Sequence, residues 1–303
     1  MRYVLGIDAG GTKTLALLAD ETGQVVGTAL GGGANLKTHG ELEVEKVLHH
    51  VAEVAESRAG FRPEAVALGI AGADRPHDRA VLAGVFKRIG FKSHVVITND
   101  ARIAFVAGSD RRVGLALVCG TGSIAWGRNA RGEIARAGGR GWHVGDEGSG
   151  FWIGERAIRS VLRASDGRGP ATALTQRLFQ HFEVEGVDGL ISAIYDEEYP
   201  RHRVATFAAK VEAAALKGDR VASGILDSAA VELTLAAQSV VGRLDLETAP
   251  YDVVLTGGTF AALPGLEADV TRRLSTAQAR VRRLDAEPAM GAVQLAIEEL
   301  QRS

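Results

Sequence analysis

Short apolar runs and segments of helical periodicity alternate along the first hundred residues of the chain. Five apolar runs predict strands, at 3–7, 14–19, 25–30, 65–70 and 95–98. The first three are separated only by short turns, a pattern typical of an antiparallel meander. Apolar residues at helical spacing over 44–55 and 79–88 predict two helices between the later strands.

The same pattern begins again after residue 113. Three strands are predicted at 114–119, 124–128 and 133–137. A helical region follows from about 148 to 244, with loops around 166–169, 183–186 and 199–202. The chain then predicts a strand at 251–255, a helix at 265–274, a strand at 279–284 and a helix after Pro288. We interpret this as a structural duplication whose second copy is interrupted by a helical insertion.

Composition narrows the classes of function. With 303 residues the chain can form two domains, and 46% hydrophobic residues are typical of a globular protein. The net charge of -2 does not favour nucleic acid or an anionic membrane as a partner. The single cysteine, Cys119, excludes an intrachain disulfide and a cysteine-based zinc site. Charge at Asp8 argues against a signal peptide and no apolar run is expected to span a membrane, so we expect a cytoplasmic protein.

Glycine is abundant, with 38 residues, and it gathers in short groups beside the predicted strands. Three buried strands each end in a glycine-hydroxyl turn, at Gly10-Gly11-Thr12, Gly120-Thr121-Gly122-Ser123 and Gly257-Gly258-Thr259. Such turns are ordinary hairpin chemistry, but their bare backbone N–H groups also bind phosphate. Three in this order favour a nucleotide site. Asp8, next to the first turn, adds a negative charge that indicates a divalent cation between it and the phosphates.

These motifs resemble those of the actin-like ATPase superfamily of sugar kinases and Hsp70-type ATPases. Within it the chain is similar to the BadF/BadG/BcrA/BcrD-type group, which contains N-acetylglucosamine kinases and archaeal hexokinases. The matching segments are Gly-Ile-Asp-Ala-Gly-Gly-Thr-Lys-Thr at 6–14, Thr-Asn-Asp-Ala at 98–101, Cys-Gly-Thr-Gly-Ser at 119–123, Gly-Gly-Arg-Gly-Trp at 138–142, Gly-Asp-Glu-Gly-Ser at 145–149 and Leu-Thr-Gly-Gly at 255–258. They cover nearly the full length.

The resemblance implies two ribonuclease-H-like α/β domains with a central cleft and a helical insertion in the second. The expected domains are 1–105 with 289–303, and 106–288. The first two turns would hold the phosphates of ATP and the third would support adenosine. The implied ATP-binding residues are Gly10, Gly11, Thr12, Lys13, Gly120, Thr121, Gly122, Gly257 and Gly258, with Mg²⁺ held near Asp8 through water.

Asp100 is the expected catalytic residue. In the resembling family the Asp at this position acts as general base toward a sugar hydroxyl, a task that needs a carboxylate within hydrogen-bond reach. The alternative is a helix N-cap, because Asp100 follows a strand and opens a predicted helix.

The resemblance also implies that Asn35, Asp100, Thr121, Gly141 and Asp146 contact the sugar. Asn35 is equally typical of a turn, and Asp146 of a solvated turn that caps the next helix. Asp74 is a weaker candidate, as an acidic loop residue.

At the position of Arg140, animal N-acetylglucosamine kinases carry Trp, whereas archaeal hexokinases resemble this chain. The Arg140 side chain could reach a phosphate or an acidic substituent, or pair with nearby acids. For Trp142 we favour core packing over stacking on a sugar, for His143 a structural role, and for Cys119 a buried position.

The function expected from these observations is phosphorylation of the 6-hydroxyl of a hexose or 2-amino-hexose by ATP, with N-acetylglucosamine or glucosamine as the first candidates. A broad-specificity hexokinase or glucokinase is the alternative, and a non-kinase BadF-type ATPase or a nucleotide sensor is a weaker one. Activators that hold an iron–sulfur cluster need more cysteines than Cys119 alone. The family implies a small-molecule sugar substrate and a homodimer.

Overall fold

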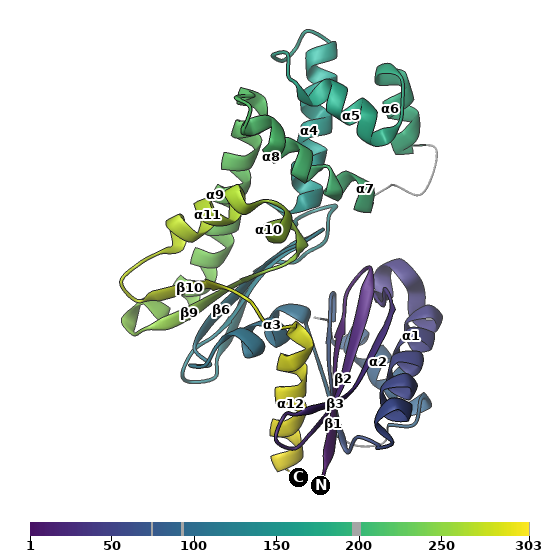
Figure 1. Cartoon of the computed structure of the whole chain (residues 1–303). Helices are drawn as coiled ribbons and strands as arrows, with labels where there is room; N and C mark the ends of the chain where they lie inside the picture. The colour runs from purple at the N-terminus through teal and green to yellow at the C-terminus, as the bar shows by residue number, and fades with distance from the viewer. Residues whose placement is uncertain (74, 92–93, 196–200, 303) are drawn as a thin grey trace. The chain divides into compact units, whose positions relative to one another are not determined.

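The computed structural model describes residues 1–73, 75–91, 94–195 and 201–302. The chain forms two units, Met1–Arg112 with Arg283–Ser303, and Val113–Arg282. Each unit is built on a five-stranded sheet (Figure 1).

The first unit has a mixed sheet with the strand order β3-β2-β1-β4-β5. Strands β1, β2 and β3 form the antiparallel meander, and β4 and β5 continue from β1 in parallel. The elements are β1 (Tyr3–Ala9), β2 (Lys13–Asp20), β3 (Val25–Gly32), α1 (Leu36–Ala59), β4 (Ala65–Ile70), α2 (Pro76–Arg88), β5 (Val95–Thr98), α3 (Asp100–Gly108) and α12 (Pro288–Arg302).

The second unit repeats this connectivity, with the strand order β10-β9-β6-β7-β8. Its meander is β6 (Gly114–Cys119), β7 (Ser123–Arg128) and β8 (Ile134–Gly138), and β9 (Tyr251–Thr256) lies parallel to β6. The remaining elements after the insertion are a short 3-10 helix (Leu246–Thr248), α10 (Gly258–Ala262), α11 (Pro264–Leu274) and β10 (Ala279–Arg283). The predicted α/β fold with a duplicated meander is therefore confirmed.

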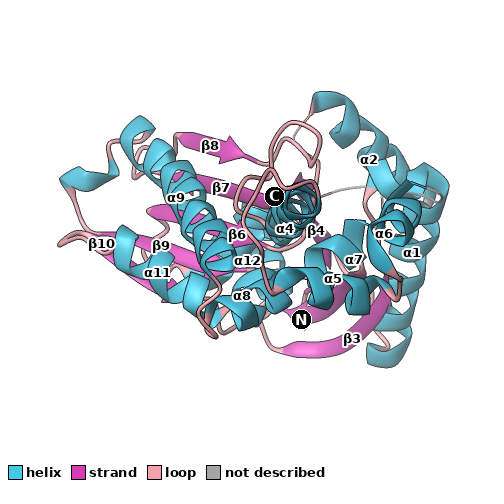
Figure 2. Ribbon diagram, turned by 90° about the horizontal axis from the view of Figure 1, so that it is seen from above, coloured by secondary structure: helices cyan, strands magenta, loops and turns pink. Residues whose placement is uncertain are grey.

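In the described residues, six α-helices form the insertion between β8 and β9. They are α4 (Gly150–Ser165), α5 (Leu174–Phe182), α6 (Gly186–Tyr195), α7 (Arg201–Thr206), α8 (Ala208–Ala215) and α9 (Arg220–Arg243). Helix α9 runs over the second sheet, against β6, β7 and β8 (Figure 2). Six apolar side chains of α9 are completely buried in the core of this unit: Ala222, Ala229, Ala230, Leu233, Ala237 and Val240.

Helix α9 is also the one helix in the described part of the chain that is long and apolar enough to cross a membrane. The expectation that no apolar run has this property is wrong for α9. The apolarity has a structural reason, because the buried face of α9 packs on a sheet and α9 also contacts α4, α8 and α11.

Strand β1 lies at the centre of the first unit and serves two cores. Leu5 and Ile7 face the core formed with α1 and α2, whereas Val4 faces the core formed with α3 and α12. Because side chains alternate along a strand, Gly6 and Asp8 share the face of Val4. Asp8 is thereby directed to the side of the sheet that α3 and α12 cover.

Two glycines allow α12 to approach this face closely. A Cβ atom on Gly6 would lie 2.4 Å from the backbone nitrogen of Val293, and a Cβ atom on Gly291 would lie 1.9 Å from the carbonyl oxygen of Ile103. Neither position has room for any other side chain. Helix α12 therefore contacts both β1 and α3 through its backbone.

Gly291→Ala is expected to destabilise the protein by about 1–3 kcal/mol or more, because the new methyl group must displace backbone atoms of α3. Gly84→Ala, in the interior of α2, is the matched control: its nearest neighbour is the flexible end of Arg88, at 3.4 Å. This control should raise stability slightly, since alanine favours a helix over glycine. The midpoint of urea unfolding measures the stability of both variants. Equal midpoints for Gly291→Ala and Gly84→Ala would contradict the close contact between α12 and α3.

Candidate active site

The first glycine turn joins β1 to β2. The N–H of Gly10 donates to the carbonyl oxygen of Lys13 at 2.9 Å, which closes the turn. The end of β3 packs on it: the N–H of Ala34 donates to the carbonyl oxygen of Gly10 at 3.0 Å, and a Cβ atom on Gly33 would lie 2.2 Å from the carbonyl oxygen of Gly11. The residue that follows, Asn35, is thus held beside the turn.

Asn35 begins the first turn of α1. Its carbonyl oxygen accepts from the N–H groups of Thr38 and His39, at 3.1 and 2.9 Å. The turn-forming interpretation therefore describes its backbone. The side chain of Asn35 keeps partial solvent exposure and lies next to the glycine turn, so the two interpretations do not exclude each other.

Open space lies in front of two of the three glycine turns. A Cβ atom on Gly11 or on Gly258 would meet no protein atom within 4 Å. Gly10, Gly11, Gly120 and Gly122 all lack a positive φ, so their conformation would admit other residues. The bare backbone at these positions leaves N–H groups accessible, as a phosphate-binding turn requires.

The negative charges of Asp100 and Glu287 both act on Asp8. Removal from water, followed by the negative charge of Asp100, raises the pKa of Asp8 from 3.8 to about 7; Lys13 opposes this shift and Glu287 adds to it. The Lys13 Nζ atom lies 4.0 Å from Oε2 of Glu287. Glu287 was not among the predicted site residues, although its place directly before the proline that opens α12 was visible in the sequence.

Asn99, not Asp100, is the N-cap of α3. The N–H of Arg102 donates to Oδ1 of Asn99 at 2.8 Å, and Asp100 occupies the first position inside the helix. The Asp100 carboxylate accepts from the N–H of its neighbour Ala101 at 2.9 Å, whereas an N-cap side chain accepts from an N–H two or three residues further on. The N-cap interpretation of Asp100 is therefore wrong.

In the second unit, the second and third glycine turns lie side by side. The Thr259 hydroxyl donates to the carbonyl oxygen of Gly120 at 2.8 Å, and a Cβ atom on Gly257 would lie 2.3 Å from the carbonyl oxygen of Cys119. The N–H of Gly150, the first residue of α4, donates to the same Gly120 oxygen at 3.0 Å. Cys119 itself is fully buried, as predicted, and burial raises the pKa of its thiol.

Asp146 is held against the second turn. Its side chain is only 6% exposed, and its Oδ2 atom lies where a Cβ atom on Gly122 would be 2.8 Å away. Burial raises the pKa of Asp146, while backbone N–H groups of Ser123 and Gly141 and the charge of Arg201 oppose the shift. Asp146 is therefore not a solvated residue.

Asp146 does not cap α4 either. Ser149 does, since its hydroxyl oxygen accepts from the N–H of Trp152 at 3.2 Å. The Asp146 backbone adopts a left-handed conformation, with φ of 59°, and this turns the carboxylate toward Gly122 and Gly141.

The remainder of the loop carries aromatic and basic side chains. Trp142 packs against the core of the unit, with its ring 5.4 Å from Phe151 and 3.6 Å from His143 between centroids, which agrees with the packing interpretation. His143 and Arg140 are exposed. The guanidinium carbon of Arg201 lies 5.4 Å from the centroid of the Trp142 ring. No sequence pattern pointed to Arg201, because the fold alone brings α7 to this loop.

The predicted site residues thus form two groups. The first unit holds Asp8, Gly10, Gly11, Thr12, Lys13, Asn35 and Asp100, and the second holds Gly120, Thr121, Gly122, Gly141, Asp146, Gly257 and Gly258. Asp74 lies outside the described residues. In the described ranges, no three His, Cys, Asp or Glu side chains gather in a way that would hold a metal ion by themselves.

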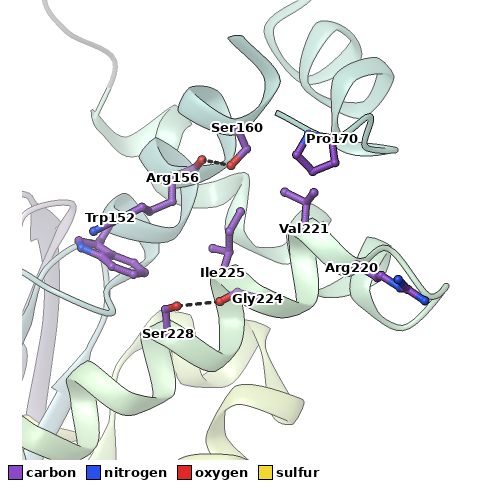
Figure 3. A pocket seen from close by; sticks show the side chains of 9 residues that line it. All are labelled: Trp152, Arg156, Ser160, Pro170, Arg220, Val221, Gly224, Ile225 and Ser228. Atoms are coloured by element: carbon purple, nitrogen blue, oxygen red, sulfur yellow. Dashed lines mark hydrogen bonds between the residues drawn. The ribbon is translucent and has the colours of Figure 1, made fainter. Parts of the chain in front are cut away.

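A pocket of about 350 Å³ lies between α4 and α9, lined by Trp152, Val221 and Ile225 among others (Figure 3). The hydroxyls of Ser160 and Ser228 donate to carbonyl oxygens of their own helices and leave the pocket without free hydroxyl donors. None of the predicted ligand-binding residues lines it.

Comparison with known proteins agrees with the motifs. Residues 5–296 match the profile of the BadF/BadG/BcrA/BcrD ATPase family. The chain belongs to this family. The predicted membership of this family is therefore confirmed over almost the whole sequence.

Three curated relatives of this family member are sugar kinases. The N-acetylmuramic acid/N-acetylglucosamine kinase of Clostridium acetobutylicum is 34% identical, with 86% of each chain covered. The N-acetyl-D-glucosamine kinase of Dictyostelium discoideum is 30% identical over 97% of each chain. The glucosamine kinase GspK of Vibrio cholerae is 30% identical, with 78% of this chain and 79% of the relative covered.

A solved structure shows the same fold. The candidate N-acetylglucosamine kinase from Chromobacterium violaceum superposes with a TM-score of 0.79 and 25% identity, covering 98% of this chain and 99% of the other. This chain thus has the two-domain actin-like ATPase fold of sugar kinases, as predicted.

The raised pKa of Asp8 predicts a pH-dependent stability. Between pH 3.8 and about 7 the unfolded chain releases a proton that folded Asp8 retains, so the free energy of unfolding should fall as the pH rises through this window. Asp8→Asn should remove this fall, and its stability relative to the wild type should rise across the window and then level off. Urea unfolding with EDTA present measures the difference. Glu21→Gln, at an exposed turn, is the control and should show a constant difference; a constant difference for Asp8→Asn would contradict the assigned burial.

Proposed function

We propose that this protein is an ATP-dependent sugar kinase that phosphorylates the 6-hydroxyl of a hexose or 2-amino-hexose, with N-acetylglucosamine and glucosamine as the first candidates. The observation that carries the proposal is the carboxylate of Asp100. Asn99 is the N-cap of α3, and the charge of Asp100, the first residue of that helix, raises the pKa of Asp8. The curated relatives, all of them amino-sugar kinases by name, support the substrate class.

The glycine turns provide the groups that ATP would need. Gly10, Gly11, Thr12 and Lys13 would bind phosphate oxygens in the first unit, Gly120, Thr121 and Gly122 would do so in the second, and Gly257 and Gly258 would support adenosine. The open space at Gly11 and Gly258 supports this assignment, because a nucleotide can approach the protein backbone there without meeting a side chain.

The charges around Asp8 fit Mg²⁺. Asp8 is surrounded by the negative charges of Asp100 and Glu287, and a divalent cation would relieve their repulsion. Mg²⁺ commonly uses one or two carboxylates, its own waters and substrate phosphates, so a cage of protein ligands is not required. Asp8 would hold the ion through water, and the bound ion would neutralise phosphate charge.

Asp100 would accept the proton of the sugar hydroxyl while Asn35, Thr121, Gly141 and Asp146 orient the ring. The Asp146 carboxylate has more lone pairs than the backbone N–H groups of Ser123 and Gly141 use, so it can also accept from sugar hydroxyls. Most of the rate enhancement would come from positioning and from charge stabilisation of the transferred phosphoryl group.

A broad-specificity hexokinase is the second candidate, because Arg140 stands where a Trp is expected for animal N-acetylglucosamine kinases. The electron-transfer activators are disfavoured by Cys119, which is fully buried and therefore cannot reach a cluster at a surface. Domain roles for 1–105 with 289–303 and for 106–288, homodimerisation and a cytoplasmic location stay predictions.

Gly11→Ala should weaken ATP binding at least tenfold without loss of stability, since its methyl group meets no protein atom but would occupy the space of a phosphate. Gly224→Ala, in α9, also meets no atom within 4 Å and is the control. The KM for ATP and the thermal midpoint measure the two effects. Unchanged ATP binding in Gly11→Ala would contradict the phosphate assignment.

The function is tested by ADP release over a panel of hexoses and amino-hexoses. We expect sugar-dependent turnover with a 6-phosphate as product, and Asp100→Asn should lower kcat by about 10²-fold or more while sugar binding stays within a few fold.

The control for this prediction is Asp110→Asn, an exposed carboxylate just beyond the same helix, which should keep wild-type turnover. Turnover that is independent of every sugar would overturn the kinase proposal. Near-wild-type kcat in Asp100→Asn would overturn only the role of this residue.

A further inference from the structure

Arg201 approaches the loop that holds Asp146, although it comes from a distant part of the sequence. It is the first residue of α7, inside the helical insertion, and its side chain is half-buried. Its guanidinium carbon lies 5.4 Å from the Trp142 ring centroid, and its charge acts on Asp146. All three residues belong to the second unit. Arg201 therefore borders the carboxylate to which we assign sugar binding.

One hydrogen-bond donor of Arg201, its buried Nε atom, is left without an acceptor by the described part of the chain. Arg203, two positions later, shows the usual arrangement: its Nε and Nη2 atoms both donate to the carbonyl oxygen of His181, at 3.1 and 2.8 Å. A buried guanidinium N–H without an acceptor is a costly arrangement that a bound acceptor would relieve.

The protein does not provide this acceptor at the loop. The Asp146 carboxylate already accepts from the N–H groups of Ser123 and Gly141, and no ion pair within 4 Å joins it to Arg201 among the described residues. Glu147, the other acidic side chain of the loop, is exposed. A planar guanidinium binds a carboxylate through two parallel hydrogen bonds, which makes a carboxylate the best-matched acceptor.

We propose that Arg201 is a substrate-binding residue that determines specificity by binding the carboxylate of an acidic amino sugar, such as the lactyl ether carboxylate of N-acetylmuramic acid. This inference rests on the proposed kinase function. The Clostridium relative, by its name, acts on both an acidic and a neutral amino sugar, so a single sugar site in this family can admit the additional group. Arg201 would favour the acidic sugar while Asp146 binds hydroxyls common to both.

The test compares N-acetylmuramic acid with N-acetylglucosamine, which differ only in the acidic ether. In Arg201→Gln we expect kcat/KM for the acidic sugar to fall at least tenfold more than kcat/KM for the neutral one, mainly through KM. Arg201→Lys should recover part of the loss, since it keeps the charge but not the bidentate geometry.

Arg156→Gln is the matched control. Arg156 also lies over a tryptophan of this unit, 4.4 Å from the Trp152 ring centroid, but it borders the pocket between α4 and α9 (Figure 3). It should leave the ratio of the two efficiencies unchanged.

Equal losses for both sugars in Arg201→Gln would overturn the proposal and assign Arg201 to support of the Asp146 loop. The same holds if wild type phosphorylates the neutral sugar but not the acidic one. If wild type phosphorylates no sugar at all, the proposed function fails instead, so the two failures are distinguishable.

Discussion

The close contact of α12 with β1 and α3 is the constraint on which the first unit depends. It exists only because Gly6 and Gly291 have no side chains: a Cβ atom would lie 2.4 Å from α12 at the first and 1.9 Å from α3 at the second. Asp8 lies two residues after Gly6 on the same face of β1, and Asp100 opens α3. The helix from the C-terminal end of the chain thus positions both carboxylates of the candidate active site.

The second unit uses the same device around its glycine turns. Gly257 packs its backbone on that of Cys119, and Gly122 leaves room for the Asp146 carboxylate. Hydrogen bonds from Thr259 and Gly150 to the Gly120 oxygen hold the two turns and α4 together. Glycines therefore have two separate roles here. Some are required by contacts between backbones, whereas Gly11 and Gly258 face open space and are free to admit a ligand.

Buried charge connects this packing to chemistry. Asp8 and Asp146 are both partly removed from water, which raises the pKa of each, and the buried Nε atom of Arg201 has no hydrogen-bond acceptor in the described part of the chain. Such groups are expensive in a folded protein unless a ligand compensates them. A cation near Asp8 and a sugar with an acidic substituent near Arg201 would provide the missing charges in the proposed reaction.

The sequence alone determined the order of strands along the chain, the duplicated meander and the positions of the glycine turns, because local periodicity and turn chemistry depend on neighbours along the chain. The motifs at these turns also indicated the family. It also pointed to Asp8, Asp100 and Asp146. Only the tertiary structure decided that Asn99 rather than Asp100 caps α3, that Asp146 is buried against Gly122, and that α9 is a core helix. It alone brought Glu287 and Arg201 to the site residues, since contacts between distant segments depend on packing that no local pattern records.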